Sequence, residues 1–323
     1  MPKVEILAPH GFCSGVKAAI ETALRVLAVS GAEVYCLHEL VHNEAVVADL
    51  KARGMHFVDD LVEIPQGATV LFSAHGVGPS IRREAVRRGL TTIDATCPFV
   101  ARVHRQVRDY AARGMPVAVI GHSEHVEVRG VVDEARDAGA QVAVVAGPED
   151  VPTLAFPTGA RIGVVSQTTL SSDAVSRVLG ELRARYRDVE TTPASEACMA
   201  TRDRQEAVKA FAARGGDGVL VLGSAKSSNT RRLAELAESG GARAWRVATL
   251  EELAASDFTG VSVLGVTSGA STPESFFVQS VEHLSKRFGT LAARLPSVVY
   301  PEFASCESEK QRSSPNPLAF FIN

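Results

Sequence analysis

Short apolar runs alternate along this chain with segments whose apolar residues recur at helical spacing. The runs are nearly continuous, which is typical of strands buried on both faces of a parallel sheet. Parallel strands need crossover connections, and the helical segments between the runs provide them. The pattern therefore predicts an α/β protein built on parallel sheets. The predicted strands are 4–7, 34–37, 70–72, 117–120, 142–145, 162–165, 219–222 and 261–264, and the predicted helices include 18–27, 82–88, 174–186, 205–213 and 232–238.

Length and charge narrow the class of protein. A chain of 323 residues has room for two or three domains, and 46% hydrophobic and 22% charged residues are ordinary for a soluble globular protein. A net charge of −3 without a basic block gives no indication of a nucleic-acid or membrane partner. The chain starts directly on a strand pattern, without a targeting segment or an apolar run long enough to cross a bilayer, so we expect a cytoplasmic protein.

The cysteines favour metal binding or catalysis over disulfides. There are five, an odd number, widely spaced in a chain without an export signal. Cys36 falls inside a predicted strand and is expected to fill the core. Cys306 lies in a terminal segment rich in Ser, Pro and charged residues, which also holds Phe320 and Phe321 and has no predicted role.

Cys97 is placed where a thiolate is stabilised. It follows a strand end at Ile93 and precedes Pro98, which suits the first position of a helix. The positive end of a helix lowers the pKa of a cysteine, although a small buried residue at a turn is the simpler interpretation of this stretch alone.

Cys13 and Cys198 also open helical stretches, 84 and 101 residues away from Cys97. No close pair of cysteines exists, which excludes a zinc finger or a bacterial-ferredoxin run. The spacing suggests one thiolate from each of three domains on a central metal, with a position left for substrate.

Polar residues also cluster where predicted strands end. In parallel α/β sheets, ligands bind beyond the carboxyl ends of the strands. A chain selected only for stability would not place His, Cys, Ser and Asn at nearly every such position, so we expect one shared site. The clusters are 9–15, 38–43, 73–77, 121–127, 166–169, 224–229 and 267–271.

Seven collinear motifs in these clusters resemble the 4-hydroxy-3-methylbut-2-enyl diphosphate reductase (LytB/IspH) family. They are Gly-Phe-Cys-Ser-Gly-Val at 11–16, Val-His-Asn at 41–43, Ser-Ala-His-Gly-Val at 73–77, Asp-Ala-Thr-Cys-Pro at 94–98, Ser-Gln-Thr-Thr-Leu-Ser at 166–171, Ser-Ser-Asn at 227–229 and Gly-Ala-Ser-Thr-Pro at 269–273.

The resemblance implies an α/β trefoil, in which three small parallel-sheet domains surround a central 4Fe–4S cluster. Their bounds would be 15–97, 98–195, and 196–284 together with 1–14, followed by a C-terminal tail at 285–323 that is expected to be partly disordered. The implied reaction is the last step of the non-mevalonate isoprenoid pathway. It removes the allylic hydroxyl of the substrate reductively and yields isopentenyl and dimethylallyl diphosphate, with electrons from a ferredoxin or flavodoxin.

The family's site residues map onto this chain position by position. Cys13, Cys97 and Cys198 match the cluster ligands, Glu127 matches the proton donor, and Thr168 matches its partner near the substrate hydroxyl. The residues that match the diphosphate-binding set are His42, His75, His125, Ser227, Ser228, Asn229 and Ser271. Taken singly, these residues also have structural interpretations, as a helix cap at 227–229, as structural histidines, as a solvated carboxylate and as a turn residue.

The chain departs from the family pattern at four positions, none of which removes a ligand or the acid. Arg202 and Asp203 replace Thr-Asn, Val126 replaces a proline, and Lys226 replaces an asparagine. These changes leave open a paralogue that acts on another allylic diphosphate.

Two further alternatives come from other classes of protein. A three-cysteine trefoil enzyme similar to quinolinate synthase would bind a dicarboxylate, and arginines would be expected at the strand ends. A non-enzymatic iron–sulfur redox sensor would leave Glu127, Thr168 and Ser271 without a role.

Overall fold

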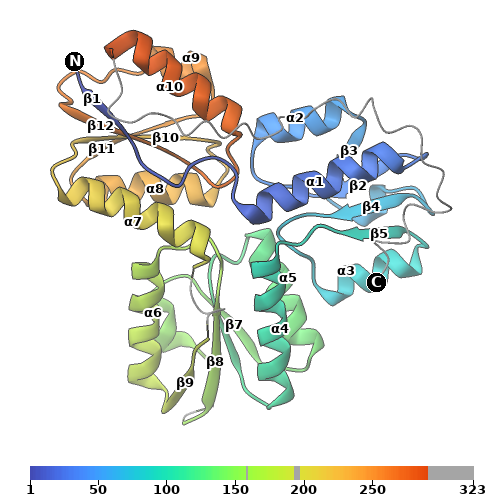
Figure 1. The fold of residues 1–323 in the computed structure, drawn as a ribbon. Helices are drawn as coiled ribbons and strands as arrows, with labels where there is room; N and C mark the ends of the chain where they lie inside the picture. Colours follow the sequence, from blue (N-terminus) through green and yellow to red (C-terminus); the bar gives the residue numbers. More distant parts are fainter. Residues whose placement is uncertain (158, 193–196, 290–323) are drawn as a thin grey trace. The chain divides into compact units, whose positions relative to one another are not determined.

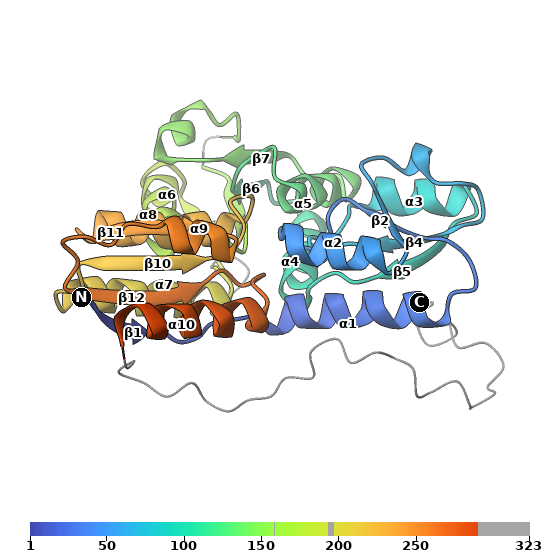
Figure 2. The ribbon, with the colours of Figure 1, turned by 90° about the horizontal axis from the view of Figure 1, so that it is seen from above.

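Three four-stranded parallel sheets form the framework of the protein (Figures 1 and 2). The structure, a computed structural model, describes residues 1–157, 159–192 and 197–289, so most of the predicted tail, with Cys306, Phe320 and Phe321, lies outside the described residues. The described chain divides into two compact units. Unit 1 consists of Met1–Val16, His42–Val46 and residues 200–289, and unit 2 consists of Lys17–Val41 and Val47–Met199. Among these residues, no helix has the length and apolar character needed to cross a membrane.

The first sheet of unit 2 has the strand order β3-β2-β4-β5. Its central strands β2 and β4 are fully buried, which explains why their sequences are almost continuously apolar. The edge strands β3 and β5 are only partly buried. Cys36 lies in β2 and is buried, as predicted, and burial raises the pKa of its thiol. The elements are α1 (Ser14–Val29), β2 (Val34–Leu37), α2 (Glu44–Ala52), β3 (Met55–Val58), the 3₁₀ helix η1 (Leu61–Glu63), β4 (Thr69–Phe72), α3 (Pro79–Arg87) and β5 (Thr91–Asp94).

The second sheet of unit 2 has the order β7-β6-β8-β9 and a core on each face. Val117 and Val119 of β6 pack with α4 and α5, whereas Ala118 and Ile120 pack with α6 on the other face. The elements are α4 (Pro98–Ala112), β6 (Val117–Ile120), α5 (Val126–Asp137), β7 (Val142–Val145), η2 (Pro148–Thr153), β8 (Arg161–Ser166), α6 (Ser172–Arg185) and β9 (Asp188–Glu190).

The sheet of unit 1 joins the two ends of the described chain. Its order is β1-β12-β10-β11 (Figure 1). Lys3 of β1 is in register with Val263 of β12. Helices α7 and α8 cover one face, through Phe211 and Leu233, and α9 and α10 cover the other, through Leu253 and Phe277. The elements are β1 (Lys3–Ile6), α7 (Met199–Ala213), β10 (Gly218–Leu222), α8 (Ser228–Ser239), β11 (Arg243–Val247), α9 (Leu250–Ala255), β12 (Val263–Ser268) and α10 (Glu274–Phe288).

All three sheets share one topology. The first and third strands in chain order lie in the centre, and the second and fourth lie at the edges. In unit 1 the fourth place is taken by β1, as the resemblance implies. Each sheet therefore has a topological switch point between its two central strands, where α/β proteins bind ligands. The predicted class of small parallel-sheet α/β domains is confirmed, and of the predicted strands 261–264 differs most, since β12 begins two residues later, at Val263.

Candidate functional site

The predicted site residues divide according to the strand that they follow. Every predicted substrate-contacting residue follows one of the two central strands of a sheet, at the carboxyl end where the switch point lies. Each of the three predicted cluster ligands follows a fourth strand instead: Cys97 after β5, Cys198 after β9 and Cys13 after β1. Each of these cysteines also immediately precedes a helix, α4, α7 or α1. One arrangement is thus used three times.

A backbone hydrogen bond attaches each of these cysteines to the loop after the third strand of its own sheet. The N–H of Cys97 donates to the carbonyl of Ala74 at 3.0 Å. The N–H of Cys198 donates to Thr168 at 3.1 Å, and that of Cys13 donates to Ala270 at 3.0 Å. These carbonyls lie within or beside the predicted substrate residues His75, Thr168 and Ser271. The hydrogen bonds therefore hold the backbone of each cysteine next to a loop of the same sheet that carries a predicted substrate residue.

The three cysteines suit a soft metal centre. All are partly buried thiols that directly precede a helix, and cysteine thiolates are the usual ligands of iron–sulfur clusters. The N–H of Val16 already points at Cys13 Sγ, at 3.4 Å. The turn before Cys97 is fixed by Asp94, whose Oδ1 accepts the Thr96 N–H at 2.9 Å. Among the described residues, neither unit by itself gathers three His, Cys, Asp or Glu side chains into a metal site.

Glu127 is a buried carboxyl group held by one neighbour. It lies in the first turn of α5, and the residue is only 2% exposed. Thr168 donates its N–H to Oε1 at 2.7 Å and its hydroxyl to Oε2 at 3.0 Å. Burial raises the pKa of Glu127 to about 7, against the opposing effect of these two hydrogen bonds. A carboxyl group with this pKa can both hold and release a proton near neutral pH.

Thr168 joins the acid to a predicted cluster ligand. Its N–H and hydroxyl bind Glu127, while its carbonyl accepts the N–H of Cys198. The residue follows β8, and Glu127 follows β6, the neighbouring strand in the sheet. Pairing of these two strands therefore brings the buried carboxyl group of Glu127 to the same residue that binds the backbone of Cys198.

Two histidines of unit 2 lie close together. The rings of His75 and His125 meet edge to face, with centroids 5.9 Å apart. His125 caps α5, and its Nδ1 accepts the N–H of Glu127 at 3.2 Å. A neutral imidazole with Nδ1 as acceptor carries its proton on Nε2, which makes Nε2 a donor suited to an anion.

Unit 1 offers a second set of groups suited to an anion at the start of α8. Ser227 caps this helix and accepts the N–H of Thr230 at 3.3 Å. Asn229 is 3% exposed, and neither its amide oxygen nor its amide nitrogen has a hydrogen-bond partner among the residues that the structure describes. Buried polar groups are nearly always paired, so this amide fits a ligand beside the positive end of α8.

The loop after β12 lies against this helix start. Gly269 has no side chain, and a Cβ there would come within 2.1 Å of Thr230 Oγ1. Two residues later, the Ser271 hydroxyl donates to the carbonyl of His42 at 3.0 Å. Unit 1 thus brings together its predicted diphosphate residues from the segments after β10 and β12 with His42.

A match to a family model decides the identity of the chain. Residues 4–285 match the model described as LytB protein. The chain belongs to the LytB family. This is a family of iron–sulfur reductases of the non-mevalonate isoprenoid pathway, so the predicted resemblance and enzyme class are confirmed.

Named relatives and solved structures agree with this assignment. A 4-hydroxy-3-methylbut-2-enyl diphosphate reductase of Chromohalobacter salexigens is 42% identical over 295 residues, which are 91% of this chain and 92% of the relative. Reductase 1 of Mycobacterium tuberculosis is 42% identical over 285 residues, 87% of this chain and 85% of the relative. The structure of E-1-hydroxy-2-methyl-but-2-enyl-4-diphosphate reductase from Plasmodium falciparum matches with a TM-score of 0.84 and 34% identity, and the match covers 89% of both chains. A second solved reductase, titled the terminal enzyme of the non-mevalonate pathway, matches with a TM-score of 0.65 and 33% identity, covering 88% of this chain and 100% of that one.

The departures from the LytB motifs lie mostly at the surface. Arg202, Asp203 and Lys226 are exposed, and Val126 is the partly buried first residue of α5. Solvent and salt screen exposed charges. We therefore expect these substitutions to affect the chemistry much less than a change at Glu127 would.

One buried arginine of the LytB fold was not singled out by the motifs. Arg204 lies on α7 and donates to the carbonyl of Gly11 and to that of Ala200, each at 2.8 Å. It thereby ties the loop before Cys13 to the first turn of α7. Its position on the apolar face of the helix, between Thr201 and Val208, was a signal that the sequence contained.

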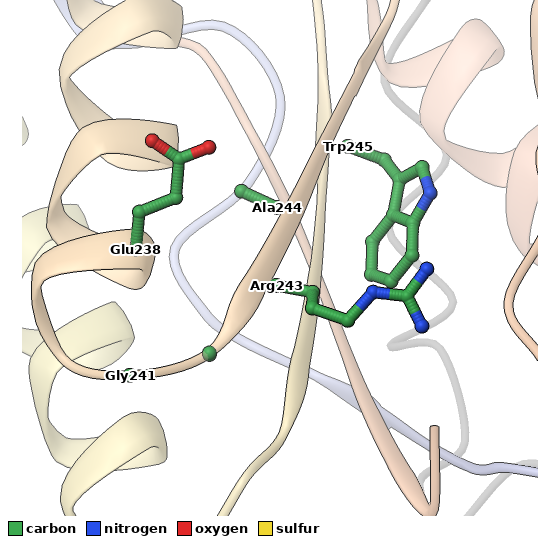
Figure 3. A pocket seen from close by; sticks show the side chains of 6 residues that line it. Glu238, Gly241, Arg243, Ala244 and Trp245 are labelled. Atoms are coloured by element: carbon green, nitrogen blue, oxygen red, sulfur yellow. The ribbon is translucent and has the colours of Figure 1, made fainter. Parts of the chain in front are cut away.

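A cavity elsewhere on unit 1 is not part of this site. It has a volume of about 430 Å³ and lies at the amino end of β11, where Arg243 and Trp245 project from the strand (Figure 3). The predicted site residues follow the opposite, carboxyl ends of the strands, and none of them lines this cavity.

Proposed function

We propose that this chain reduces (E)-4-hydroxy-3-methylbut-2-enyl diphosphate to isopentenyl diphosphate and dimethylallyl diphosphate. Two electrons and two protons enter, the allylic C–O bond breaks, and the hydroxyl group leaves as water. The observation that carries the proposal is Thr168, which binds the buried acid Glu127 and the backbone of Cys198 at once. The names of the relatives support the same substrate.

The proposed cofactor is a 4Fe–4S cluster bound by Cys13, Cys97 and Cys198. Its support is the threefold use of one arrangement, a cysteine at a helix start whose N–H binds the neighbouring substrate loop. When bound, the cluster supplies the electrons. Cys36 is excluded because its thiol is buried and its pKa is raised.

The remaining residues have roles that follow from their surroundings. Glu127 delivers a proton to the leaving hydroxyl group, and Thr168 keeps its carboxyl group oriented. The diphosphate is bound by hydroxyl, amide and imidazole groups and by the start of α8. These groups come from His42, His75, His125, Ser227, Ser228, Asn229 and Ser271.

The proposal includes the division into domains, the electron donor and the location. Domains 15–97, 98–195, and 196–284 with 1–14 each contain one complete sheet, which supports these bounds. A ferredoxin or flavodoxin in the cytoplasm would supply the electrons.

An anaerobic assay tests the proposed function. The full chain, purified without oxygen, is reduced with dithionite and a viologen mediator and mixed with the allylic diphosphate. We expect both five-carbon diphosphates as products. A protein with full iron–sulfur absorbance that forms neither product would contradict the proposal.

Replacing Asn229 by leucine should change stability and ligand binding in opposite ways. An unsatisfied buried polar group lowers the stability of the folded protein by about 1–3 kcal/mol. Leucine has the same branched shape as asparagine but no polar atoms to leave unsatisfied. We expect an equal or higher Tm, but binding of inorganic pyrophosphate at least about tenfold weaker, from calorimetric titration.

The matched control is Asn43→Leu. Asn43 is also buried, but its Oδ1 accepts the N–H of Val46 at 3.1 Å, so this variant should lose stability. A lower Tm in Asn229→Leu with unchanged pyrophosphate affinity would show that the Asn229 amide serves the fold.

A further inference from the structure

A buried histidine–glutamate pair lies outside the proposed catalytic residues. His104 of α4 and Glu134 of α5 are each 6% exposed, and His104 Nδ1 is 2.8 Å from Glu134 Oε2. His104 comes seven residues after Cys97, and Glu134 comes seven residues after Glu127. Seven residues are about two helical turns. The pair therefore joins α4 and α5, which lie side by side (Figure 1). It lies about two turns along α4 from Cys97 and about two turns along α5 from Glu127.

The same imidazole also supports the loop of His75. Gly76 follows His75 with a φ of 75°, and a Cβ on it would lie 3.2 Å from His104 Nε2. From α5, a Cβ on Gly130 would lie 3.5 Å from His104 Cε1 and 3.6 Å from the Gly76 carbonyl oxygen. The imidazole thus packs where α4, α5 and the His75 loop meet.

The negative charge of Glu134 determines which nitrogen of the His104 ring carries the proton. Burial would raise the pKa of Glu134, but hydrogen bonds from His104 and Arg108 outweigh it, so the pKa is lowered and the group is a carboxylate. Arg108 binds the other carboxylate oxygen at 2.8 Å and is about half exposed. An ionised carboxylate only accepts hydrogen bonds, so Nδ1 of His104 carries a proton and Nε2 faces Gly76.

We propose that His104 is a positioning residue, which sets the relative placement of Cys97, Glu127 and His75 by binding Glu134 and packing on Gly76. The inference rests on the proposed function of those three residues. A misplacement of about 1 Å at a reacting group can cost about 10²-fold in rate, so a residue that touches none of the reactants can control turnover. A purely structural histidine would change the Tm and leave the kinetic constants unaltered.

Four variants of the full-length holoenzyme separate these roles. His104→Leu removes the bond to Glu134, whereas His104→Asn keeps a side-chain nitrogen near the place of Nδ1. His104→Gln places its amide nearer to Nε2 and loses the bond. Val107→Ala, at a fully buried position on the same helix, opens a cavity in the apolar core between α4, α5 and the sheet and leaves the His104–Glu134 hydrogen bond in place.

The measurements are kcat, KM, Tm and the electron paramagnetic resonance spectrum of the reduced cluster with substrate bound. We expect His104→Leu to lose about 10²-fold in kcat/KM and to change the spectrum at full iron content. His104→Asn should recover most of the activity, and Val107→Ala should lower only the Tm.

Different results would contradict the proposed function and the positioning role of His104. A wild-type holoenzyme without turnover contradicts the proposed function. A normal wild type in which His104→Leu matches Val107→Ala in kcat, KM and spectrum overturns the positioning role. Where His104→Leu does not fold, equal kcat/KM values in His104→Asn and His104→Gln overturn it.

Discussion

Glutamine at position 127 will lower turnover about 10²–10⁴-fold while the protein keeps its cluster and its affinity for substrate. Glutamine retains the shape of the side chain and can still accept a hydrogen bond from Thr168, but it has no proton to transfer. The loss should therefore fall on kcat, with KM nearly unchanged. Single-turnover kinetics with the pre-reduced enzyme measure the step directly. The matched control is Glu124→Gln, because Glu124 is exposed in the same loop. Normal turnover in Glu127→Gln together with an inactive Glu124→Gln would reassign the acid.

The pH dependence of the activity tests the same role of Glu127 as the acid. Burial raises the pKa of Glu127 from 4.5 to about 7, so the acid is protonated below that value and ionised above it. Activity that depends on its proton should fall as the pH rises through about 7. The stability that Glu127 contributes to the folded state changes with pH in the same direction as the activity. This contribution is fully present below pH 4.5 and is lost as the pH rises through about 7. Glu127→Gln should lack both dependences, which kcat–pH and Tm–pH series will show. An alkaline limb that persists in the variant belongs to another group.

Serine in place of Cys13, Cys97 or Cys198 will abolish the brown iron–sulfur absorbance of anaerobically purified protein. A hydroxyl is a much weaker ligand for iron than a thiolate, and each of these cysteines supplies one ligand of the proposed cluster. Absorbance and iron content after reconstitution measure the effect. Circular dichroism checks that the fold remains.

The control for this series is Cys36→Ala. It removes a buried, protonated thiol in β2 and should keep the full absorbance. Wild-type absorbance in Cys97→Ser would exclude Cys97 as a ligand.

The sequence predicted all six central strands, although it placed the start of β12 two residues early. All five residues of β10 are buried, so its apolar run is unbroken and easily recognised. Edge strands have a solvent-facing side that accepts charge, and this hides them from a hydrophobicity pattern. In β11, Arg243 and Arg246 are exposed, and the strand was not predicted. The other edge strands missed in this way are β3 and β9.

Within the site, local features were predictable and long-range pairings were not. The helix start at Cys97 and the cap at Ser227 follow from neighbouring residues. A glutamate in the first turn of a helix is ordinarily solvated, so nothing near Glu127 in the sequence foretells its burial. Its environment comes from Thr168, 41 residues further on, through the pairing of β6 and β8. His104 could have been found, since it interrupts the apolar face formed by Val100, Val103 and Val107.

The pairing of β1 with β12 also sets the timing of maturation during synthesis. Lys3 meets Val263, so the first strand emerges from the ribosome 260 residues before its partner. At translation rates of about 5–20 residues per second, that interval is on the order of tens of seconds. Until then the backbone hydrogen bond from Cys13 to Ala270 cannot form, and this thiol has no fixed position. Delivery of the proposed cluster would therefore follow near-complete synthesis, and a nascent chain stalled before β12 would expose the Cys13 thiol together with an unpaired strand edge.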